Sequence, residues 1–354
     1  MSIIHSTTKL PGDRGYAEDW NADHIVTDES KPKNFTTLIV AASNSLDTTR
    51  ADYVCDGVDD QDEINTAISA LPVQGGRVSL LEGTYQTTSE INISKDNVSI
   101  EGLGRATTIQ TTITSGHIIT AQNRKGILIS NIHFLGFPDL NCYCLWFGNV
   151  TDSIINHCWF DSFWGPPIYF LTTCCNNLIH GNIFENNKFN SNIFILGSSN
   201  YNTISNNLSS NCESNGLNLQ GSNCIVINNN FSNSSNGNGI YMVGSNKALI
   251  ANNQINHNCL CGIRMSQCND VIISGNMIYD NDQTGLVNWD GILLFECDYC
   301  IITGNSCRSN RRYEINISDA GSDLNLVHGN ICVDGHLGAI NDAGTGTVLA
   351  DNIT

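Results

Sequence analysis

Side chains that can catalyse acid–base reactions gather between positions 257 and 314 of this 354-residue chain. The segment YDNDQTGLVNWDGILLF, residues 279–295, combines three aspartates with Trp289. Although the whole chain has only 16 lysines and arginines, several arginines lie close to this segment in the sequence. Carboxylates beside guanidinium groups can transfer protons and hold an anionic substrate. The candidate catalytic residues are Arg264, Asp280, Asp282, Asp290, Glu296, His257, Arg308 and Arg311.

Two kinds of reaction suit this set. β-Elimination or epimerisation of a uronic acid requires a positive group that neutralises the sugar carboxylate and a base that removes the neighbouring proton. Arg264, His257, Tyr241 and the arginines of residues 308–312 could provide both. A glycoside hydrolase or fructosyl transferase instead needs two carboxylates, which the acidic members of the set could provide. Sequence spacing does not place their oxygens, so both reactions remain open.

A repeat of about 24 residues positions these side chains. Each copy reads aliphatic-x-x-Asn-x-apolar, and a period of this length is typical of a solenoid whose copies stack on one another. The step from Asn276 to Asn305 is 29 residues, whereas the other steps are 22–25 residues, so the acidic segment is an insertion in the repeat. The repeated anchor positions are Cys158, Asn182, Asn207, Asn229, Asn253, Asn276, Asn305 and Asn330.

The copies consist of short β-branched runs broken by Asn, Ser and Gly, which favours strands over helices. Stacked coils place equivalent Asn side chains about one strand spacing apart, where their amides can form a hydrogen-bonded ladder. Asn also tolerates the left-handed backbone of a tight turn. The sequence therefore predicts an all-β fold, a single-stranded right-handed parallel β-helix.

A second strand in each copy predicts which side chains face inward and which face outward. An aliphatic column from Leu145 to Ile315 should point into the core, so the residue after each member should point outward. This outward column is Trp146, Tyr169, Phe194, Asn218, Tyr241, Arg264, Leu293 and Asn316. Aromatic rings in a row can pack against sugar rings, so the candidate substrate-binding residues are Trp146, Tyr169, Phe194, Tyr241, Trp289 and Arg312. A covering loop or partner subunit, as in a homotrimer, is the alternative explanation of such a stripe.

The ends of the chain differ from the repeat. Residues 1–35 are polar and unpatterned and are expected to form an arm or attachment segment. Residues 36–100 should form an N-terminal cap and first coil, with an amphipathic helix over 59–71 that covers the open end of the solenoid. Residues 101–335 should form the β-helix, and residues 336–354 a C-terminal cap.

The composition of the chain argues against several classes of binding partner. A net charge of −18 argues against nucleic acid and anionic membranes, and no segment has the length and apolarity of a membrane span. The 15 cysteines lack the paired spacing of a zinc site, so we expect most to be small buried residues and predict no metal site. The sequence identifies no certain cofactor, and Ca²⁺ is a candidate for uronate chemistry. Without a signal peptide, we expect a cytoplasmic or phage-associated protein, or one exported by a non-classical route.

Residues 51–93, ADYVCDGVDDQDEINTAISALPVQGGRVSLLEGTYQTTSEINI, followed by NVSIEGLG, resemble the opening of right-handed β-helix proteins of the pectate-lyase-like superfamily. The shared pattern is an Asp-Gly-x-x-Asp-Asp segment before a capping helix and a Gly-Gly-x-Val strand. The resemblance implies the fold and assigns Asp56, Asp59 and Asp60 to the fold signature. It leaves activity open, because the superfamily includes lyases, hydrolases, epimerases, fructan-converting enzymes and phage tailspikes. The segment DWNADHIV also resembles phage tail-associated proteins.

Together these observations favour an enzyme that cleaves or isomerises a polysaccharide or oligosaccharide. β-Elimination or epimerisation of a uronic acid polymer is the first hypothesis, because of the clustered arginines. A glycoside hydrolase or fructosyl transferase is the second hypothesis. The third is a glycan-binding phage tailspike or structural β-helix without catalytic activity.

Overall fold

The computed structural model describes residues 36–354, apart from positions 138, 140, 189 and 287. It also describes two short strands, β1 (Ile4–His5) and β2 (His24–Ile25), which pair antiparallel. The remainder of the expected arm, residues 1–35, lies outside the described residues. No helix in the described part of the chain is long and apolar enough to cross a membrane.

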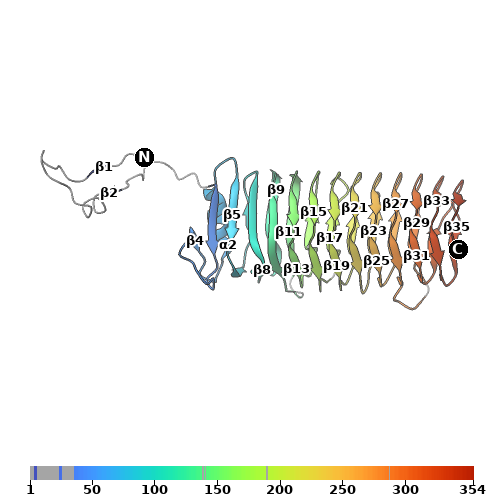
Figure 1. The fold of residues 1–354 in the computed structure, drawn as a ribbon, viewed down its shortest axis with the longest axis horizontal. Helices are drawn as coiled ribbons and strands as arrows, with labels where there is room; N and C mark the ends of the chain where they lie inside the picture. The colour runs from blue at the N-terminus through green and yellow to red at the C-terminus, as the bar shows by residue number, and fades with distance from the viewer. Residues whose placement is uncertain are drawn as a thin grey trace, which may run out of the picture. The chain divides into compact units, whose positions relative to one another are not determined.

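From residue 36 onward the chain winds into a coil whose successive turns stack along one axis (Figure 1). Each regular turn contributes one short strand to each of three sheets, which we call sheets 1, 2 and 3 in chain order. All strand pairs in these sheets are parallel, as in the pairing of β23 (Ile240–Val243) with β26 (Ile263–Ser266). The structure therefore confirms the predicted parallel β-helix.

The bounds of the strands show how short each side of the coil is. Strands β8 and β10 are longer and belong to both sheet 1 and sheet 2. Sheet 1 contains β3 (Thr37–Ala41) with β4 (Tyr53–Val54) beside it, β5 (Gly76–Leu80), β8 (Val98–Thr111), β10 (Leu128–Leu135), β12 (Ile154–Asn156), β15 (Leu178–His180), β18 (Thr203–Ser205), β21 (Ile225–Ile227), β24 (Leu249–Ala251), β27 (Ile272–Ser274), β30 (Ile301–Thr303), β33 (Leu326–His328) and β36 (Val348–Ala350). Sheet 2 continues from β8 and β10 and adds β6 (Gly83–Thr87), β13 (Trp159–Asp161), β16 (Ile183–Glu185), β19 (Leu208–Ser210), β22 (Asn230–Ser232), β25 (Gln254–Asn256), β28 (Met277–Tyr279), β31 (Ser306–Arg308) and β34 (Ile331–Val333). Sheet 3 contains β7 (Ile91–Ile93), β9 (Ser115–Lys125), β11 (Asn141–Thr151), β14 (Ile168–Phe170), β17 (Ile193–Ile195), β20 (Leu217–Leu219), β23, β26, β29 (Ile292–Phe295), β32 (Tyr313–Ile317) and β35 (Gly338–Asp342).

Helix α2 (Gln61–Ala70) lies at the N-terminal end of the coil (Figure 1). Its Ile64, Ala67 and Ile68 side chains are fully buried, so the amphipathic segment covers the open end as predicted. The helix is three residues shorter than the predicted range 59–71. Asp60 precedes it and accepts hydrogen bonds from the Gly57 and Gln86 backbone N–H groups, which ties the cap to the first coil.

The Asn anchors lie at the turn between sheets 1 and 2 and form the predicted ladder. From Asn182 onward, each side-chain Nδ2 donates to the Oδ1 of the equivalent Asn one coil later, at 2.9–3.1 Å, and the last acceptor is Asn352. The left-handed backbone belongs to the residue before each anchor, for example Asn228 and Gly275, and not to the anchor itself. The anchors are therefore Asn because they form the side-chain ladder.

The core is a continuous column of buried aliphatic, aromatic and cysteine side chains. Phe134, Phe160 and Phe184 stack inside it with centroids 5.2 and 4.9 Å apart. Of the 15 cysteines, 13 are buried and none is in a disulfide, which confirms that most are small core residues.

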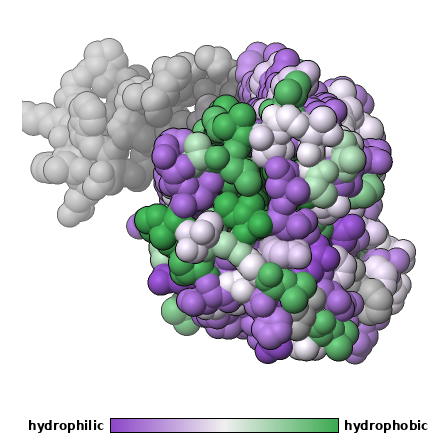
Figure 2. All heavy atoms as spheres, turned by 90° about the vertical axis from the view of Figure 1, so that its right-hand side faces the viewer, coloured by the Kyte–Doolittle hydropathy of each residue, from purple (hydrophilic) through white to green (hydrophobic). Residues whose placement is uncertain are grey.

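The C-terminal segment 336–354, expected as a cap, contains β35 and β36, which extend sheets 3 and 1 by one more coil. Figure 2 views this end and shows apolar side chains gathered between polar ones. Val348, Leu349 and Ile353 are exposed here. Apolar side chains of the last coil are therefore exposed to solvent at this end.

We predict that Asn229→Ala destabilises the protein by roughly 2–4 kcal/mol, because it leaves buried amide groups without partners. Asn229 Oδ1 accepts from the backbone N and the Nδ2 of Asn207, and its own Nδ2 donates to Asn253. Thermal and urea unfolding measure the change. Asn230→Ala is the matched control, since the adjacent Asn230 side chain makes no hydrogen bond to the described residues and its loss should change stability by less than about 1 kcal/mol. Equal losses in the two variants would contradict a stabilising ladder.

Candidate functional site

The outward column lies on sheet 3, and strand register aligns its members. Trp146 pairs with Tyr169 and Tyr169 with Phe194, while Tyr241 pairs with Arg264. The inward neighbours in the same strands are fully buried. The four aromatic residues are half-buried, so parts of their rings remain open to solvent. The column is thus a surface along the coil axis on which side chains repeat at about 4.8 Å, the spacing of parallel strands.

The rings near the N-terminal end of this column form one cluster that includes two residues missed by the sequence analysis. His117 stacks on Trp146 with ring centroids 4.9 Å apart and also contacts Tyr143 at 5.3 Å. Tyr143 contacts Tyr169, which contacts Phe194 at 5.3 Å. Period-two alternation could not find Tyr143, because Cys144 and Leu145 are both fully buried and the alternation breaks between them.

His117 is the histidine of the aromatic cluster. Burial lowers its pKa from about 6.5 to about 4, so the ring is neutral at neutral pH. Its Nδ1 is buried and has no hydrogen-bond partner among the described residues. A neutral imidazole stacked on an indole can donate or accept one hydrogen bond to a bound molecule.

Farther along the column, Arg264 lies between two aromatic rings. Its guanidinium carbon is 5.5 Å from the centre of the Tyr241 ring and 5.6 Å from that of Trp289. Within the described residues Arg264 makes no salt bridge, and its buried Nε has no hydrogen-bond partner. A positive charge held in place without a carboxylate partner is suited to bind an anion.

The insertion brings Trp289 to this position. Residues 280–291 connect β28 to β29, whereas residues 257–262 make the equivalent connection one coil earlier. In Figure 1 the insertion is the orange loop that projects from the edge of the coil. Asp282 is fully buried inside it and accepts the backbone N–H groups of Asn288 and Trp289 at 2.8 and 3.2 Å. The Asp282 carboxylate therefore holds the loop in shape.

Asp290 is also fully buried, and both of its oxygens are occupied. They accept the Nε and Nη2 of Arg312 at 2.8 and 2.6 Å, in a bidentate ion pair. The same carboxylate accepts the Tyr313 backbone N–H and the Asn316 Nδ2. This network fixes the end of the insertion against β32, beside Trp289.

The remaining candidates lie in two other places. His257 is 3.8 Å from Asp280, and Arg308 lies 5.8 Å from the Tyr279 ring, so these side chains gather at the sheet 2 side of the insertion. Arg311 is exposed and its guanidinium lies near Gly285 of the insertion. Glu296 follows β29, at the end opposite to Asp290, and accepts a hydrogen bond from Gln267. The structure thus separates Glu296 from the other carboxylates.

A further buried carboxyl lies next to the arginines of residues 308–312 but was not among the candidate catalytic residues. Glu314 is fully buried and accepts the backbone N–H and the Nδ2 of Asn310, at 3.2 and 2.5 Å. It ends a second ladder formed by Asn258, Asn281 and Asn310 at the turn between sheets 2 and 3. Burial raises the pKa of Glu314 from 4.5 to about 7.

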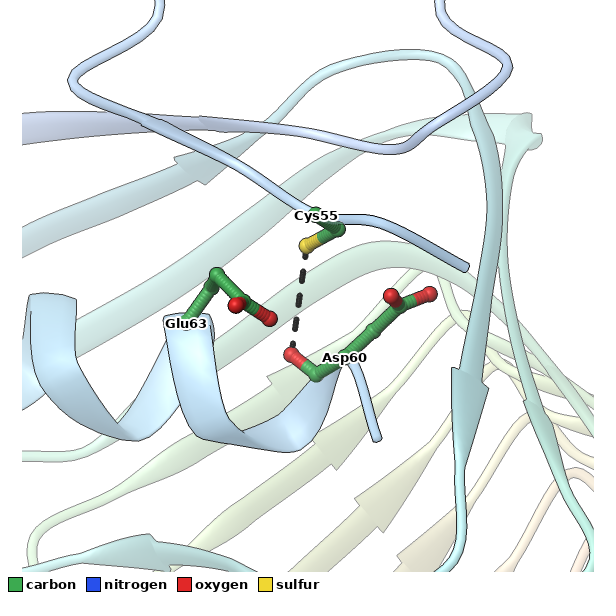
Figure 3. Close-up of side chains that lie close together, drawn as sticks. All are labelled: Cys55, Asp60 and Glu63. Carbon is green, nitrogen blue, oxygen red and sulfur yellow. Dashed lines mark hydrogen bonds between the residues drawn. The ribbon is translucent and has the colours of Figure 1, made fainter. Parts of the chain in front are cut away.

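A third group of titratable side chains belongs to the cap. Figure 3 shows Cys55, Asp60 and Glu63, whose ligand atoms lie within 4.8 Å of one another, the one such group of three in the described part of the chain. The Asp60 carboxylate is already bonded to two backbone N–H groups. Burial raises the pKa of the Cys55 thiol, which keeps it protonated. We therefore assign these three side chains a structural role in the cap.

Comparison with known proteins gives the same fold. The family model described as the right handed beta helix region matches residues 186–288 and 218–354. The A-module of mannuronan C-5 epimerase AlgE6 of Azotobacter vinelandii matches with a TM-score of 0.64 at 19% identity, over 84% of this chain and 96% of that one. The chain is a right-handed parallel β-helix. A search of curated protein sequences finds no match.

Two further structures share this parallel β-helix fold. The Dettilon tailspike protein matches with a TM-score of 0.63 at 15% identity, over 82% of this chain and 62% of that one. The catalytic domain of a GH87 α-1,3-glucanase, in complex with tetrasaccharides, matches with a TM-score of 0.57 at 12% identity, over 87% and 69%. At these identities the likeness shows the fold.

We predict that Glu314 makes the β-helix less stable as pH rises. Folding raises the pKa of this carboxyl, so the stability that it contributes is present below about pH 4.5 and is lost as pH rises through about 7. Glu314→Gln should remove this dependence and should melt several degrees above the parent at about pH 8, but close to it at about pH 5. Melting temperatures of both proteins across this range test the sign, and a variant that melts below the parent at high pH would contradict it.

We also predict that Asp290→Asn destabilises the protein by roughly 2–4 kcal/mol, because it breaks a buried bidentate ion pair. Asp280→Asn is the matched control from the same loop. Asp280 is about half exposed and lies 3.8 Å from His257, so its loss should change stability by less than about 1 kcal/mol. Urea unfolding of both variants measures the difference. An unchanged stability of Asp290→Asn would show that the ion pair does not fix the loop.

Proposed function

We propose that this protein acts on a uronic-acid polysaccharide that lies along the outward column of sheet 3, and that it removes the proton next to a sugar carboxylate. The observation that carries the proposal is Arg264, a guanidinium group held between the Tyr241 and Trp289 rings with no carboxylate partner among the described residues. The two rings restrict its movement, so it is preorganised to receive an anion.

A sugar carboxylate bound to Arg264 would be neutralised. Loss of the proton from the adjacent carbon places negative charge on that carboxylate, and the guanidinium stabilises this charge as it develops. Tyr241 is the register partner of Arg264, which makes it the proton-transferring side chain beside the carboxylate site. If the electron pair expels the glycosidic oxygen, the result is β-elimination. If a proton returns to the opposite face of the sugar, the result is epimerisation.

The aromatic cluster extends this site toward the N-terminal end of the coil. Tyr169 and Phe194 occupy the same column as Tyr241, and their half-buried rings offer faces on which sugar rings can pack. Among similar structures, the epimerase and the glucanase with bound tetrasaccharides carry names that refer to polysaccharides. Both facts support a polysaccharide as the substrate class.

A glycoside hydrolase is the second candidate function, and one observation favours it. Asp161 and Glu185 are register partners on adjacent coils of sheet 2, so their side chains leave the sheet about 5 Å apart. Trp159 lies in the same strand as Asp161, donates its indole N–H to Glu185 at 2.8 Å and is covered by Arg105. A carboxylate pair at about this separation suits a retaining mechanism.

Turnover of uronate polymers in deuterated water tests the proposal, with and without Ca²⁺. Epimerisation is read from deuterium at the carbon next to the carboxylate, and elimination from the ultraviolet absorbance of the unsaturated sugar. We expect Arg264→Gln to lower kcat/KM at least about 100-fold with little change in melting temperature. Arg50→Gln, at an exposed arginine in the cap, is the control and should retain full activity.

Three other results would count against the proposal. Full activity of Arg264→Gln would contradict the proposal. Reducing ends that form without deuterium or an unsaturated product, and that disappear in Glu185→Gln, would favour the hydrolase. An absence of turnover with tight binding would favour a glycan-binding protein without catalysis.

A further inference from the structure

Asn218 lies in the outward column between the two groups of rings. It belongs to β20, and its register partners on the adjacent coils are Phe194 and Tyr241. Its neighbours within the strand, Leu217 and Leu219, are fully buried in the core, so the Asn218 side chain points out of the coil. Even so, only 8% of Asn218 is exposed. This short side chain is therefore largely covered, and its register neighbours on the two adjacent coils are the larger Phe194 and Tyr241.

The Asn218 amide makes no hydrogen bond within the described residues, and its buried Oδ1 has no partner. Every other asparagine of comparable burial in this part of the chain has at least one side-chain hydrogen bond. Asn316, farther along the same column, donates to Asp290 and accepts from Asn341. A buried amide left unpaired costs roughly 1–3 kcal/mol. Asn218 thus has the character of a binding group that is held ready for a ligand.

We propose that Asn218 forms a hydroxyl-binding subsite, in which its amide binds two adjacent hydroxyl groups of a pyranose ring. The Oδ1 of Asn218 is buried, but a primary amide also offers two N–H donors, which can donate to a pair of neighbouring hydroxyl oxygens. The Phe194 and Tyr241 rings on either side exclude water and pack against the C–H groups of the same sugar. This proposal rests on the proposed function and specifies the shape of its substrate.

The position of Asn218 defines that shape. Strands β20 and β26 are two coils apart, so Asn218 and Arg264 are separated by about 10 Å along the coil axis. A ligand that satisfies both must present a hydroxyl pair and a carboxylate at this separation. A single sugar ring is too short, so the ligand is an oligosaccharide that runs along the axis of the coil. The aromatic cluster beyond Phe194 continues the same line.

Calorimetric binding of oligouronates to Asn218→Leu tests the subsite. Leucine has a similar size and cannot form hydrogen bonds, so it removes the unpaired amide without opening a cavity. We expect affinity for a hexasaccharide to fall about tenfold to a hundredfold and affinity for a monosaccharide to remain unchanged. The melting temperature should be unchanged or higher, because no protein hydrogen bond is lost. Asn92→Leu is the matched control, since Asn92 is exposed on β7, two coils before Trp146 and outside the proposed binding surface, and should leave binding unchanged.

Arg264→Gln, measured in parallel, separates this proposal from the proposed function. If Arg264→Gln weakens binding and Asn218→Leu does not, the uronate site stands and the hydroxyl subsite is wrong. If neither variant changes binding, both proposals fail. If Asn218→Leu lowers the melting temperature by several degrees, its amide has protein partners in solution, and this result too would overturn the subsite.

Discussion

The in-register parallel pairing of each coil with the next is the interaction on which the rest of this structure depends. It repeats equivalent residues at about 4.8 Å along one axis, so one favourable choice of side chain becomes a continuous column. The same register produces the buried phenylalanine stack, the Asn ladder and the outward column of sheet 3. A ladder asparagine is satisfied only when its neighbour lies in register, because the Oδ1 of one coil is the acceptor for the backbone N–H and the Nδ2 of the coil before it. The ladder therefore opposes slippage between coils, in addition to stabilising each turn.

A loop that carries a site can be inserted between two strands without changing the register of the stacked coils. The insertion at residues 280–291 leaves and rejoins the coil so that Asn276 still pairs with Asn305 across it. Within the loop, two carboxylates replace the contacts that a coil neighbour would give: Asp282 binds the loop backbone and Asp290 binds Arg312. These contacts fix the loop and so hold the Trp289 ring beside the Arg264 guanidinium group. Rigid placement of one ring beside one cation is what a preorganised anion site requires.

Much of this fold could be predicted from the sequence, because a period of about 24 residues and β-branched runs are direct consequences of stacking. The position of the outward column followed from period-two alternation, and Arg264 was found beside Tyr241 for that reason. Alternation failed at Cys144 and Leu145, where the long strand β11 buries two successive residues, and so it missed Tyr143 and His117. Sequence also could not show that Asp282 and Asp290 are buried, since an aspartate that binds a backbone N–H and one that is free for catalysis look alike. Asn218 was visible as a member of the column, but its lack of a partner is a property of the folded structure.

Sheet 3 and sheet 2 present different chemistry to a glycan. Sheet 3 offers aromatic rings, an unpaired amide and a cation along one line, whereas sheet 2 offers the Asp161 and Glu185 carboxylates beside a tryptophan that is already covered by Arg105. For this reason we place the uronic-acid polysaccharide on sheet 3. The most direct test is a crystal structure with a bound oligouronate. We expect the sugar chain to run along the coil axis over sheet 3, with a carboxylate on Arg264. A chain bound across sheet 2, with its glycosidic bond beside Asp161 and Glu185, would contradict the account.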